Sequence, residues 1–554
     1  MDIPKGYKDI ESYDVRHLPV IAAFCDKIEL CAIVDKALGC NMDVSAGKMV
    51  KGLILNTLSG RDPLYRVKEY FSHQDTELLV GKGIDSSAFS DDNIGRVFDR
   101  IYSYGTSKLF SEISLEAVKK FNIDTIQIHH DTTSASVWGA YENSKYDGSP
   151  FEITFGHSKD KRPDLAQFVI SLLCAEKDLP IETRIYSGNE DDKTISKSIL
   201  KRISAYMAGY GIDSQGFIYT GDCSMVTEPN LAYMGGADNP KVKFISRMPA
   251  TFGVVDILIK EAVAENDWTD IGRLSEEEKA GSAFYRSYER NIDIGTNKFR
   301  VAVIHSDHYD KRKKKSIDKK IVKDLKAAKA IKKKLSAIQY HCIEDARIAT
   351  QKVRLPKYHK LNITIDEKKI YKKGRPVNKI KEVANIRYGL SCKIWPDEKL
   401  IRNLKEAAGC FVLITNVNKD KYPASEILKI YKEQHGIEKN FGFLKDPLIV
   451  NDLFLKKPER IEALGLILVI SLLIWRLVER CLRGYIKEKN IKITGWDKKP
   501  TDRPTTFMMT TKFCSVHTLK KGNTRWLSRK ITNVQKEYLD ALGLSEEIFY
   551  TVVE

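Results

Sequence analysis

Three acidic residues stand where folded proteins often place catalytic side chains. Asp131 closes the alternating segment IDTIQIHHD, Asp222 follows the short apolar segment GFIYTG, and Glu438 lies within a long helical pattern. Crowded carboxylates repel one another, and hard divalent cations such as Mg²⁺ neutralise them while keeping bound water. Two such ions activate a water or a 3′-hydroxyl and stabilise the leaving oxygen of a phosphodiester. We therefore predict that these three acids bind two Mg²⁺ ions, with Mn²⁺ as a substitute, and carry out phosphoryl transfer.

Simpler roles are open for some of these residues. Asp222 stands beside Gly221, and both residue types are favoured in turns for conformational reasons. His129 and His130 precede Asp131 and could bind a metal, although histidines at strand ends more often pack or form hydrogen bonds. The prediction of a catalytic site therefore depends on whether the fold brings the three acids together.

The segment after Ile123 has the pattern of an α/β sheet. Strand patterns end at Asp131, Ala175 and Gly188, and a helical pattern, a strand, a helix and another strand follow. Ribonuclease-H-like domains have this order, with a sheet that begins antiparallel and continues through crossovers. In such a sheet the first and fourth strands are neighbours, so their carboxyl ends would place Asp131 and Asp222 within reach of one metal.

The expected fold class is α/β, with a ribonuclease-H-like catalytic domain that is interrupted by a β-rich basic insertion and preceded by an all-helical domain. In the helical domain, Ser45 and Ser90 stand where helix caps are expected. The expected regions are a helical domain for DNA-end binding (1–120), the first part of the catalytic core (121–250), the insertion (251–409), the second part of the core (410–490) and a C-terminal tail (491–554).

The balance of charge favours a polyanionic partner. The chain has 554 residues, of which 42% are hydrophobic, and its 91 Lys and Arg against 74 Asp and Glu leave a net charge of +17. Soluble chains as basic as this usually bind nucleic acid. Residues 311–334 alone contain 13 Lys or Arg and two Asp. Apolar residues from Ile317 to Ile338 recur at helical spacing, which predicts a helix with one apolar face rather than a disordered tail. A solvated helix surface is the alternative to phosphate contact by Lys313, Lys314, Lys332 and Lys333.

Export and membrane insertion are not indicated. The N-terminus lacks a basic region followed by an apolar one, and the longest apolar run, Ala463–Trp475, has 13 residues where a membrane span needs about 20. We expect this run to form a buried helix. Ten scattered cysteines without a CxxC pair argue against a disulfide framework. A cytoplasmic location, associated with the nucleoid and without membrane contact, is expected.

The pattern around Glu438 provides a separate indication. A helix is expected from Pro423 to Pro447, after a clean strand at Cys410–Asn416. On this helix Tyr431, Gln434, Glu438, Phe441 and Lys445 would follow one face over about 21 Å. A buried helix face would be apolar, whereas this face combines a phenol, an amide, a carboxylate and a lysine. We therefore interpret it as a polar face with a function of its own.

Three motifs carry a family resemblance. They are HHDTTS at 129–134, GDCSMVTEPN at 221–230 and YKEQHGIEKNFGFLK at 431–445. Together they resemble the three blocks of bacterial insertion-sequence DDE transposases of the branch with a Tyr-Arg-Glu-Lys signature. That signature has two residues between Tyr and Arg, three before Glu and six before Lys, and this chain has the same spacing. The resemblance covers roughly residues 121–480, and PERIEALGLILVISLLIW also resembles the helix that follows the signature in the family.

The resemblance implies specific roles. Asp131, Asp222 and Glu438 would be the catalytic metal ligands, and Tyr431 and Lys445 would contact DNA near the scissile phosphate. Gln434 departs from the family pattern, because it stands where the family usually has arginine. Glutamine is uncharged and lacks the paired N–H donors of a guanidinium, so it binds a phosphate more weakly than arginine does. The separation of 216 positions between Asp222 and Glu438 corresponds to the family's β-rich insertion, with RVAVIHSD and KLNITIDEKKIY as expected strands.

These observations predict a DNA transposase that cleaves the ends of a mobile element and joins the 3′-hydroxyl ends to target DNA. Its partners would be double-stranded DNA with terminal inverted repeats, target DNA and a second copy of the chain in a homodimer on paired ends. A ribonuclease-H-like nuclease without strand transfer is one rival, and strand-transfer products would exclude it. A catalytically decayed DNA-binding protein is the other, and Gln434 gives it some support.

Overall fold

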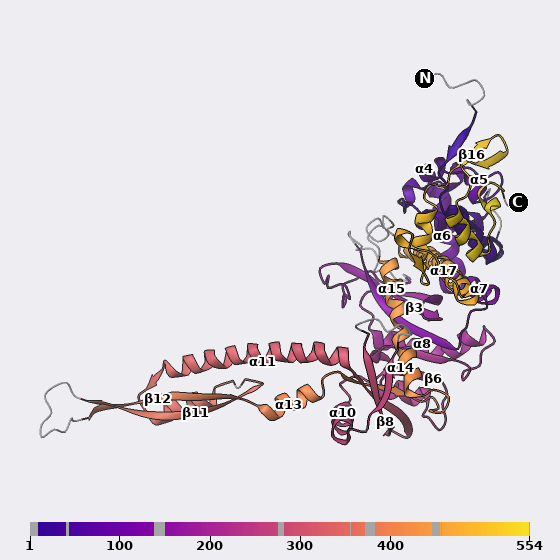
Figure 1. Cartoon of the computed structure of the whole chain (residues 1–554). Coiled ribbons are helices and arrows are strands. Elements are labelled where there is room, and N and C mark those ends of the chain that lie inside the picture. Colours follow the sequence, from indigo (N-terminus) through magenta and orange to yellow (C-terminus); the bar gives the residue numbers. More distant parts are fainter. Residues whose placement is uncertain are drawn as a thin grey trace. The chain divides into compact units, whose positions relative to one another are not determined.

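The computed structural model describes residues 9–39, 44–137, 150–274, 282–354, 356–371, 383–445, 455 and 457–552. The chain forms two compact units (Figure 1). The first consists of Met1–Ser246, Gly295–Asn297 and Ile430–Glu554, and the second of Arg247–Ile294 and Lys298–Lys429.

The first unit begins with a group of helices before its sheet. Ser45 and Ser90 cap α3 and α6 as expected, because each hydroxyl accepts a hydrogen bond from the backbone N–H three residues further on. The α-helices of this part are α1 (Leu18–Lys27), α2 (Leu30–Leu38), α3 (Ala46–Thr57), α4 (Val67–Ser72), α5 (Thr76–Leu79), α6 (Asp91–Tyr104) and α7 (Thr106–Phe121).

The sheet of the first unit has the expected order of elements. In space the strands run β4-β3-β2-β5-β6. Strand β2 pairs antiparallel with β3 and parallel with β5, and β5 pairs parallel with β6. The elements are β2 (Gln127–Val137), β3 (Ala166–Ala175), β4 (Leu179–Ser187), α8 (Asp192–Ala208), β5 (Ile218–Gly221), α9 (Glu228–Met234) and β6 (Lys243–Arg247). The molecule is therefore a mixed α/β protein.

The expected end of the first strand at Asp131 is wrong. Strand β2 continues to Val137, because β3 offers a paired partner from Ile128 opposite Ala175 to Val137 opposite Ala166. The parallel partner β5 is much shorter and ends at Gly221. Asp131 therefore lies inside a long strand, but just beyond the part that is paired on its β5 side.

The helix expected from Pro423 is interrupted. Helix α14 (Ala424–Glu433) ends before Gln434, and α15 (His435–Leu444) follows it. Pro447, expected to end this helix, lies outside the described residues. Phe441 is buried at 7% exposure, so it belongs to the core and not to a continuous polar face.

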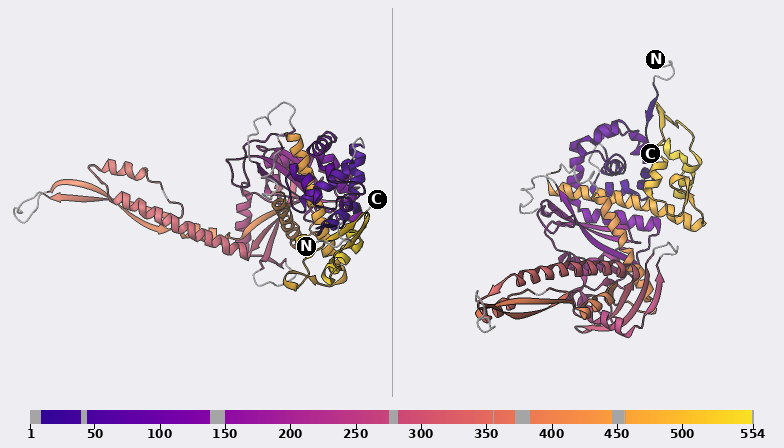
Figure 2. Two further views of the ribbon diagram at one scale, coloured as in Figure 1. Left: turned by 90° about the horizontal axis from the view of Figure 1, so that it is seen from above. Right: turned by 60° about the vertical axis from the view of Figure 1, so that its left-hand side comes forward.

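Helix α17 (Pro458–Lys489) contains the longest apolar run and confirms the expected buried helix. It contacts β4 and helices α1, α3, α6 and α7 (Figure 2). Among the helices that the structure describes, α17 alone is long and apolar enough to cross a membrane, but most of that stretch is buried inside the protein. A helix packed between other elements in this way is the core of a folded unit.

The second unit combines a sheet with an extension that consists of the long helix α11 and the antiparallel strand pair β11 and β12. Its sheet strands run in the order β13-β9-β8-β7. The expected strands RVAVIHSD and KLNITIDEKKIY lie in β9 and β11. The elements are α10 (Val254–Glu265), β7 (Thr269–Arg273), β8 (Phe284–Ile294), β9 (Asn297–Ser306), α11 (Asp307–Ser336), β10 (Gln339–Tyr340), α12 (Ile343–Gln351), β11 (His359–Tyr371), β12 (Val383–Pro396), α13 (Glu398–Glu406) and β13 (Cys410–Thr415).

The lysine-rich run forms the helix α11, as expected. Its apolar residues face the strand pair β11 and β12, where Leu335 is buried with Ala346 and Leu390. Figures 1 and 2 show α11 lying along these two strands. Ile338, which was expected to continue the apolar face, lies beyond the end of α11 and is 48% exposed.

The C-terminal tail packs against the N-terminal helices. Strand β1 (Glu11–Tyr13) pairs with β16, and Nζ of Lys27 donates a hydrogen bond to the carbonyl of Leu542 at 2.8 Å. Arg525 forms a buried ion pair with Asp75 at 2.7 Å. The tail elements are β14 (Ile493–Thr494), β15 (Pro500–Thr501), α18 (Thr506–Lys512), β16 (Thr518–Lys521), β17 (Thr524–Leu527) and α19 (Asn533–Leu542).

Candidate active site

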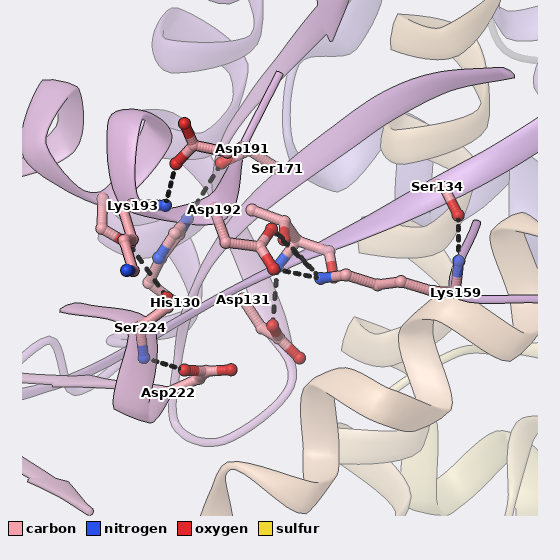
Figure 3. A network of polar contacts seen from close by, with 12 residues as sticks. His130, Asp131, Ser134, Lys159, Ser171, Asp191, Asp192, Lys193, Asp222 and Ser224 are labelled. Carbon is pink, nitrogen blue, oxygen red and sulfur yellow. Dashed lines mark hydrogen bonds and ion pairs between the residues drawn. The ribbon is translucent and has the colours of Figure 1, made fainter. Parts of the chain in front are cut away.

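Asp131 lies on β2 and Asp222 directly follows β5, and the two residues are equivalent in position along these neighbouring parallel strands. His129 of β2 is the partner of Thr220 of β5, and each aspartate lies two residues beyond its member of that pair. Since side chains alternate along a strand, both aspartates project from the same face as His129 and Thr220. Figure 3 shows the two side chains beside one another. The structure therefore brings these two predicted site residues together.

Burial makes Asp131 an unusual carboxylate. It raises the pKa of Asp131 to about 6, and the negative charges of Asp222 and Asp192 act in the same direction. Lys159 and the backbone N–H of Thr132 oppose this effect, and that N–H donates to Oδ1 of Asp131 at 2.8 Å. Two neighbouring carboxylates, one of them desolvated, form a site that favours a hard cation.

Asp222 is held by a local turn at the end of β5. Its carboxylate accepts a hydrogen bond from the backbone N–H of Ser224 and so caps a short 3₁₀ turn, Cys223–Met225. Oγ of Ser246, on β6, donates to the carbonyls of Gly221 and Asp222 at 3.0 Å each. Asp222 can therefore both close a turn and belong to the candidate site, because the turn directs its carboxylate next to Asp131.

The two histidines before Asp131 are both buried. Nε2 of His130 lies 3.0 Å from Oγ of Ser171, and the ring stacks on Tyr219. Burial lowers the pKa of His130 to about 3 and that of His129 to about 4. His130 therefore has a packing and hydrogen-bonding role, and both rings are neutral at pH 7.

Helix α15 covers the face of the sheet that carries the aspartates. Nδ2 of Asn440 donates to Sγ of Cys174 at 3.5 Å and to the carbonyl of Asp178 at 2.8 Å. Cys174 is the antiparallel partner of His129, so it lies on the same face as Asp131. A Cβ added to Gly436 would lie 2.6 Å from the carbonyl of Lys177, so only glycine allows this close approach.

Glu438 does not lie with the two aspartates. Its side chain is 65% exposed, and its Oε2 lies 2.6 Å from Nδ1 of His435, one turn earlier on α15. Within the described ranges, no group of three His, Cys, Asp or Glu residues is close enough to hold a metal ion. The two aspartates fit a divalent cation by their donor chemistry, and the third predicted ligand is on the covering helix but directed elsewhere.

The other signature positions make intramolecular contacts. Nε2 of Gln434 donates to the carbonyl of His130 at 3.4 Å, next to Asp131. Nζ of Lys445 donates to Oδ1 of Asp160 at 2.7 Å. Tyr431 is half-buried near the end of α14. Lys445, expected to contact DNA, is therefore paired with an acid of this chain.

Lys159, Asp160 and Asp192 belong to the site, and the sequence patterns did not single them out. Nζ of Lys159 donates to the carbonyl oxygen and to Oγ1 of Thr132 and pairs with Asp192 at 3.3 Å (Figure 3). A helical pattern after Gly188 was predicted, but no local pattern predicts that a lysine from a loop reaches Asp192 at the start of that helix. Such a contact is visible only in the tertiary structure.

The lysines predicted to contact DNA lie on α11 in the second unit. Lys314, Lys332 and Lys333 are exposed, and Lys313 is half-buried. The two aspartates within residues 311–334 contact basic side chains of the second unit. Asp318 pairs with Lys405 at 2.8 Å, and Oδ2 of Asp324 lies 2.8 Å from Nδ1 of His359. Because residues 311–334 contain 13 Lys or Arg, most of them exposed, and only two Asp, the exposed side of α11 is strongly positive.

Comparison with known families identifies the chain. A profile described as "Transposase DDE domain" matches residues 136–474, which is more than half of the chain. The chain belongs to the DDE transposase family. The matched part of this transposase contains Asp222 and Glu438 and begins five residues after Asp131. A domain of unknown function (DUF4277) matches residues 10–115, and no curated protein matches the chain.

Membership of this family has two general consequences. A transposase acts on DNA, and DDE transposases generally use divalent metal ions. The carboxylates of Asp131 and Asp222 are suited to such an ion, because hard cations prefer oxygen ligands.

Proposed function

We propose that this transposase cleaves phosphodiester bonds at the ends of a mobile element and transfers the 3′-hydroxyl ends to target DNA. The observation that carries the proposal is the equivalent placement of Asp131 on β2 and Asp222 directly after β5, each two residues beyond the His129 and Thr220 pair. The strand order β4-β3-β2-β5-β6 supports a ribonuclease-H-like core for this chemistry. The Tyr-Arg-Glu-Lys branch, with Gln434 in place of arginine, is part of the same proposal.

Asp131, Asp222 and Glu438 would hold two Mg²⁺ ions, with Mn²⁺ as a substitute. Bound ions would activate a water or a 3′-hydroxyl and stabilise the leaving oxygen. Asp131 is kept in place by the N–H of Thr132, and Asp222 by the N–H of Ser224. Glu438 must leave His435 before it can turn toward the aspartates, so the signature helix changes its side-chain contacts when the site assembles.

Other parts of the chain would hold DNA. The N-terminal part, 1–120, and the insertion, 251–409, would bind the terminal inverted repeats, and Lys313, Lys314, Lys332 and Lys333 would contact phosphates. Tyr431, Gln434 and Lys445 would contact DNA next to the catalytic core (121–250 and 410–490). A homodimer would pair the two ends before joining. A cytoplasmic location at the nucleoid follows from such a substrate.

The test is cleavage and joining of DNA that carries the element's own ends, in Mg²⁺, by the wild type and by Asp131→Asn, Asp222→Asn and Glu438→Gln. Each variant should lose at least a thousandfold in rate and keep its DNA affinity in EDTA, because a ligand carboxylate acts on the chemistry and not on DNA binding. Cleavage by Asp222→Asn at the wild-type rate would exclude this site.

Asp213→Asn is the matched control for Asp222→Asn. Oδ1 of Asp213 accepts a hydrogen bond from the backbone N–H of Gln215 at 2.8 Å, as Asp222 does from Ser224, but Asp213 is exposed in a loop before β5. The control therefore changes an equivalent turn contact but leaves every proposed metal ligand in place. The Asp213→Asn variant should cut and join DNA at the wild-type rate.

The same reactions separate the rival functions. A nuclease would release cut ends but give no joined product. A decayed DNA-binding protein would bind DNA equally well with and without Mg²⁺ and cut in neither Mg²⁺ nor Mn²⁺.

A further inference from the structure

The segment 157–165 joins two parts of the candidate site and is called the bridging segment here. Its base is fixed to the sheet, because Thr154 pairs with Gln167 of β3 through hydrogen bonds of 3.1 and 3.0 Å. A Cβ added to Gly156 would lie 1.9 Å from the carbonyl of Gly188. The backbone is thus packed closely against the end of β4 before the bridging segment begins.

Lys159 fixes the segment to the strand that carries Asp131. Its backbone N–H donates to Oγ of Ser134 at 2.9 Å. Its Nζ donates to the carbonyl of Thr132 at 2.7 Å and to Oγ1 of Thr132 at 2.6 Å. Since the N–H of Thr132 binds Asp131, Lys159 holds the residue that orients this carboxylate.

Asp160, the next residue, fixes the segment to the helix that carries Glu438. Its Oδ1 accepts a hydrogen bond from Nζ of Lys445 at 2.7 Å, and only 20% of the Lys445 side chain is exposed. Lys445 stands at the C-terminal end of α15, seven residues after Glu438. Consecutive side chains thus reach β2 and α15.

We propose that Lys159 and Asp160 are positioning residues, which together set the position of the Glu438 helix relative to the Asp131 strand. The proposal rests on the function proposed above for these two acids. The ion pair of Arg162 and Asp164, at 2.7 Å within the bridging segment, is exposed and local, so it fixes no other element. The pair of Asp160 and Lys445 instead joins residues that are 285 positions apart in the chain.

The expected effect on the reaction has a distinctive form. Loss of Asp160 releases the end of α15, which lowers kcat because the three carboxylates are aligned less often. It also removes a negative charge next to Lys445 and leaves this ammonium available for a DNA phosphate, so KM should stay constant or fall. A general loss of folding would instead reduce the active fraction of the protein and lower its unfolding temperature.

The experiment compares the wild type with Asp160→Asn, Lys159→Met and Asp164→Asn. Amide hydrogen exchange of residues 435–445 is measured on the DNA-free protein, together with kcat and KM for end cleavage. We expect at least fivefold faster exchange at the end of α15 and about tenfold lower kcat in Asp160→Asn and Lys159→Met. Asp164→Asn, which breaks only the local pair with Arg162, should match the wild type in both.

A charge swap tests whether the ion pair itself is responsible. Asp160→Lys combined with Lys445→Asp should restore slow exchange of α15, since the pair is rebuilt with reversed polarity. KM should be higher in the swap than in the wild type, because an aspartate at position 445 repels DNA. Lys159→Arg should retain most of the wild-type kcat, since it keeps a cationic donor for Thr132.

The outcomes separate this inference from the proposed function. Exchange of α15 in Asp160→Asn equal to that in Asp164→Asn would overturn the positioning role, whatever the activity. Suppose that α15 exchanges faster in Asp160→Asn but the wild type neither cuts nor joins DNA. This result would support the positioning role of Asp160 and reject the proposed function.

Discussion

Gln434 donates its side-chain amide to the main-chain carbonyl of His130, the residue before Asp131. Gln434, the residue that departs from the Tyr-Arg-Glu-Lys pattern, is therefore turned toward the strand that carries Asp131. The helix also breaks at this residue, between α14 and α15. This contact links the start of α15 to the strand that carries Asp131.

The first prediction concerns Gln434→Arg. An arginine that reaches a phosphate adds one charged contact, so the slope of log affinity against log salt concentration should become steeper by about 0.9. DNA binding measured between low and moderate salt in EDTA checks this. An unchanged slope would show that position 434 contacts the chain and not the DNA.

The second prediction concerns the exposed side of α11. Replacing Lys332 and Lys333 with methionine should weaken DNA binding roughly tenfold at low salt and reduce the salt slope by about 1.8, because two phosphate contacts are lost. Methionine preserves the helix. The matched control is the substitution of Lys498 and Lys499, two adjacent exposed lysines in the C-terminal tail, which should change neither quantity. Equal weakening by both pairs would indicate a non-specific effect of net charge.

The third prediction concerns the buried ion pair between the tail and the N-terminal helices. The side chains of Arg525 and Asp75 are 4% and 1% exposed, and their nearest N and O atoms are 2.7 Å apart. Arg525→Met should lower the free energy of unfolding by about 3 to 5 kcal/mol, because it leaves a carboxylate buried without its partner. Arg162→Met breaks an exposed pair and should cost less than about 1 kcal/mol. Urea denaturation of both variants checks the difference.

The fourth prediction concerns the pH dependence of stability. The hydrogen bond from Arg525 lowers the pKa of Glu77 to about 2. A carboxyl whose pKa is lower in the folded than in the unfolded state stabilises the fold fully above the unfolded pKa of about 4.3, and this contribution is lost as the pH falls toward 2. The wild type should therefore lose more stability than Glu77→Gln between pH 5 and pH 3. Parallel curves of unfolding free energy against pH for the two proteins would show that Glu77 does not contribute to the pH dependence of stability.

Local sequence patterns predicted much of the secondary structure. Ser45 and Ser90 cap helices, residues 311–334 form a helix with one apolar face, and the run at 463–475 lies in a buried helix. These features depend on backbone hydrogen bonds and on the spacing of apolar residues within a few turns. The placement of Asp222 after a short strand has the same local origin, since the residues next to it determine the turn.

The tertiary structure decided how the site is assembled. Sequence patterns suggested that the first strand ends at Asp131, but β3 supplies ten partners and extends it to Val137. They also suggested one polar face from Tyr431 to Lys445, whereas Phe441 is buried and the helix breaks at Gln434. Strand length and helix continuity depend on partners from other parts of the chain.

The ion pairs of this transposase depend even more strongly on tertiary structure. Lys445 pairs with Asp160 and Arg525 with Asp75, across 285 and 450 positions of the chain. A lysine or an arginine in a sequence has many acidic residues available to it, and no local pattern marks the one that it meets in the folded chain. Packing of the elements brings particular partners together. Residue types and spacing thus predicted which acids would carry the chemistry, and the fold decided that Asp131 meets Asp222 while Glu438 faces His435.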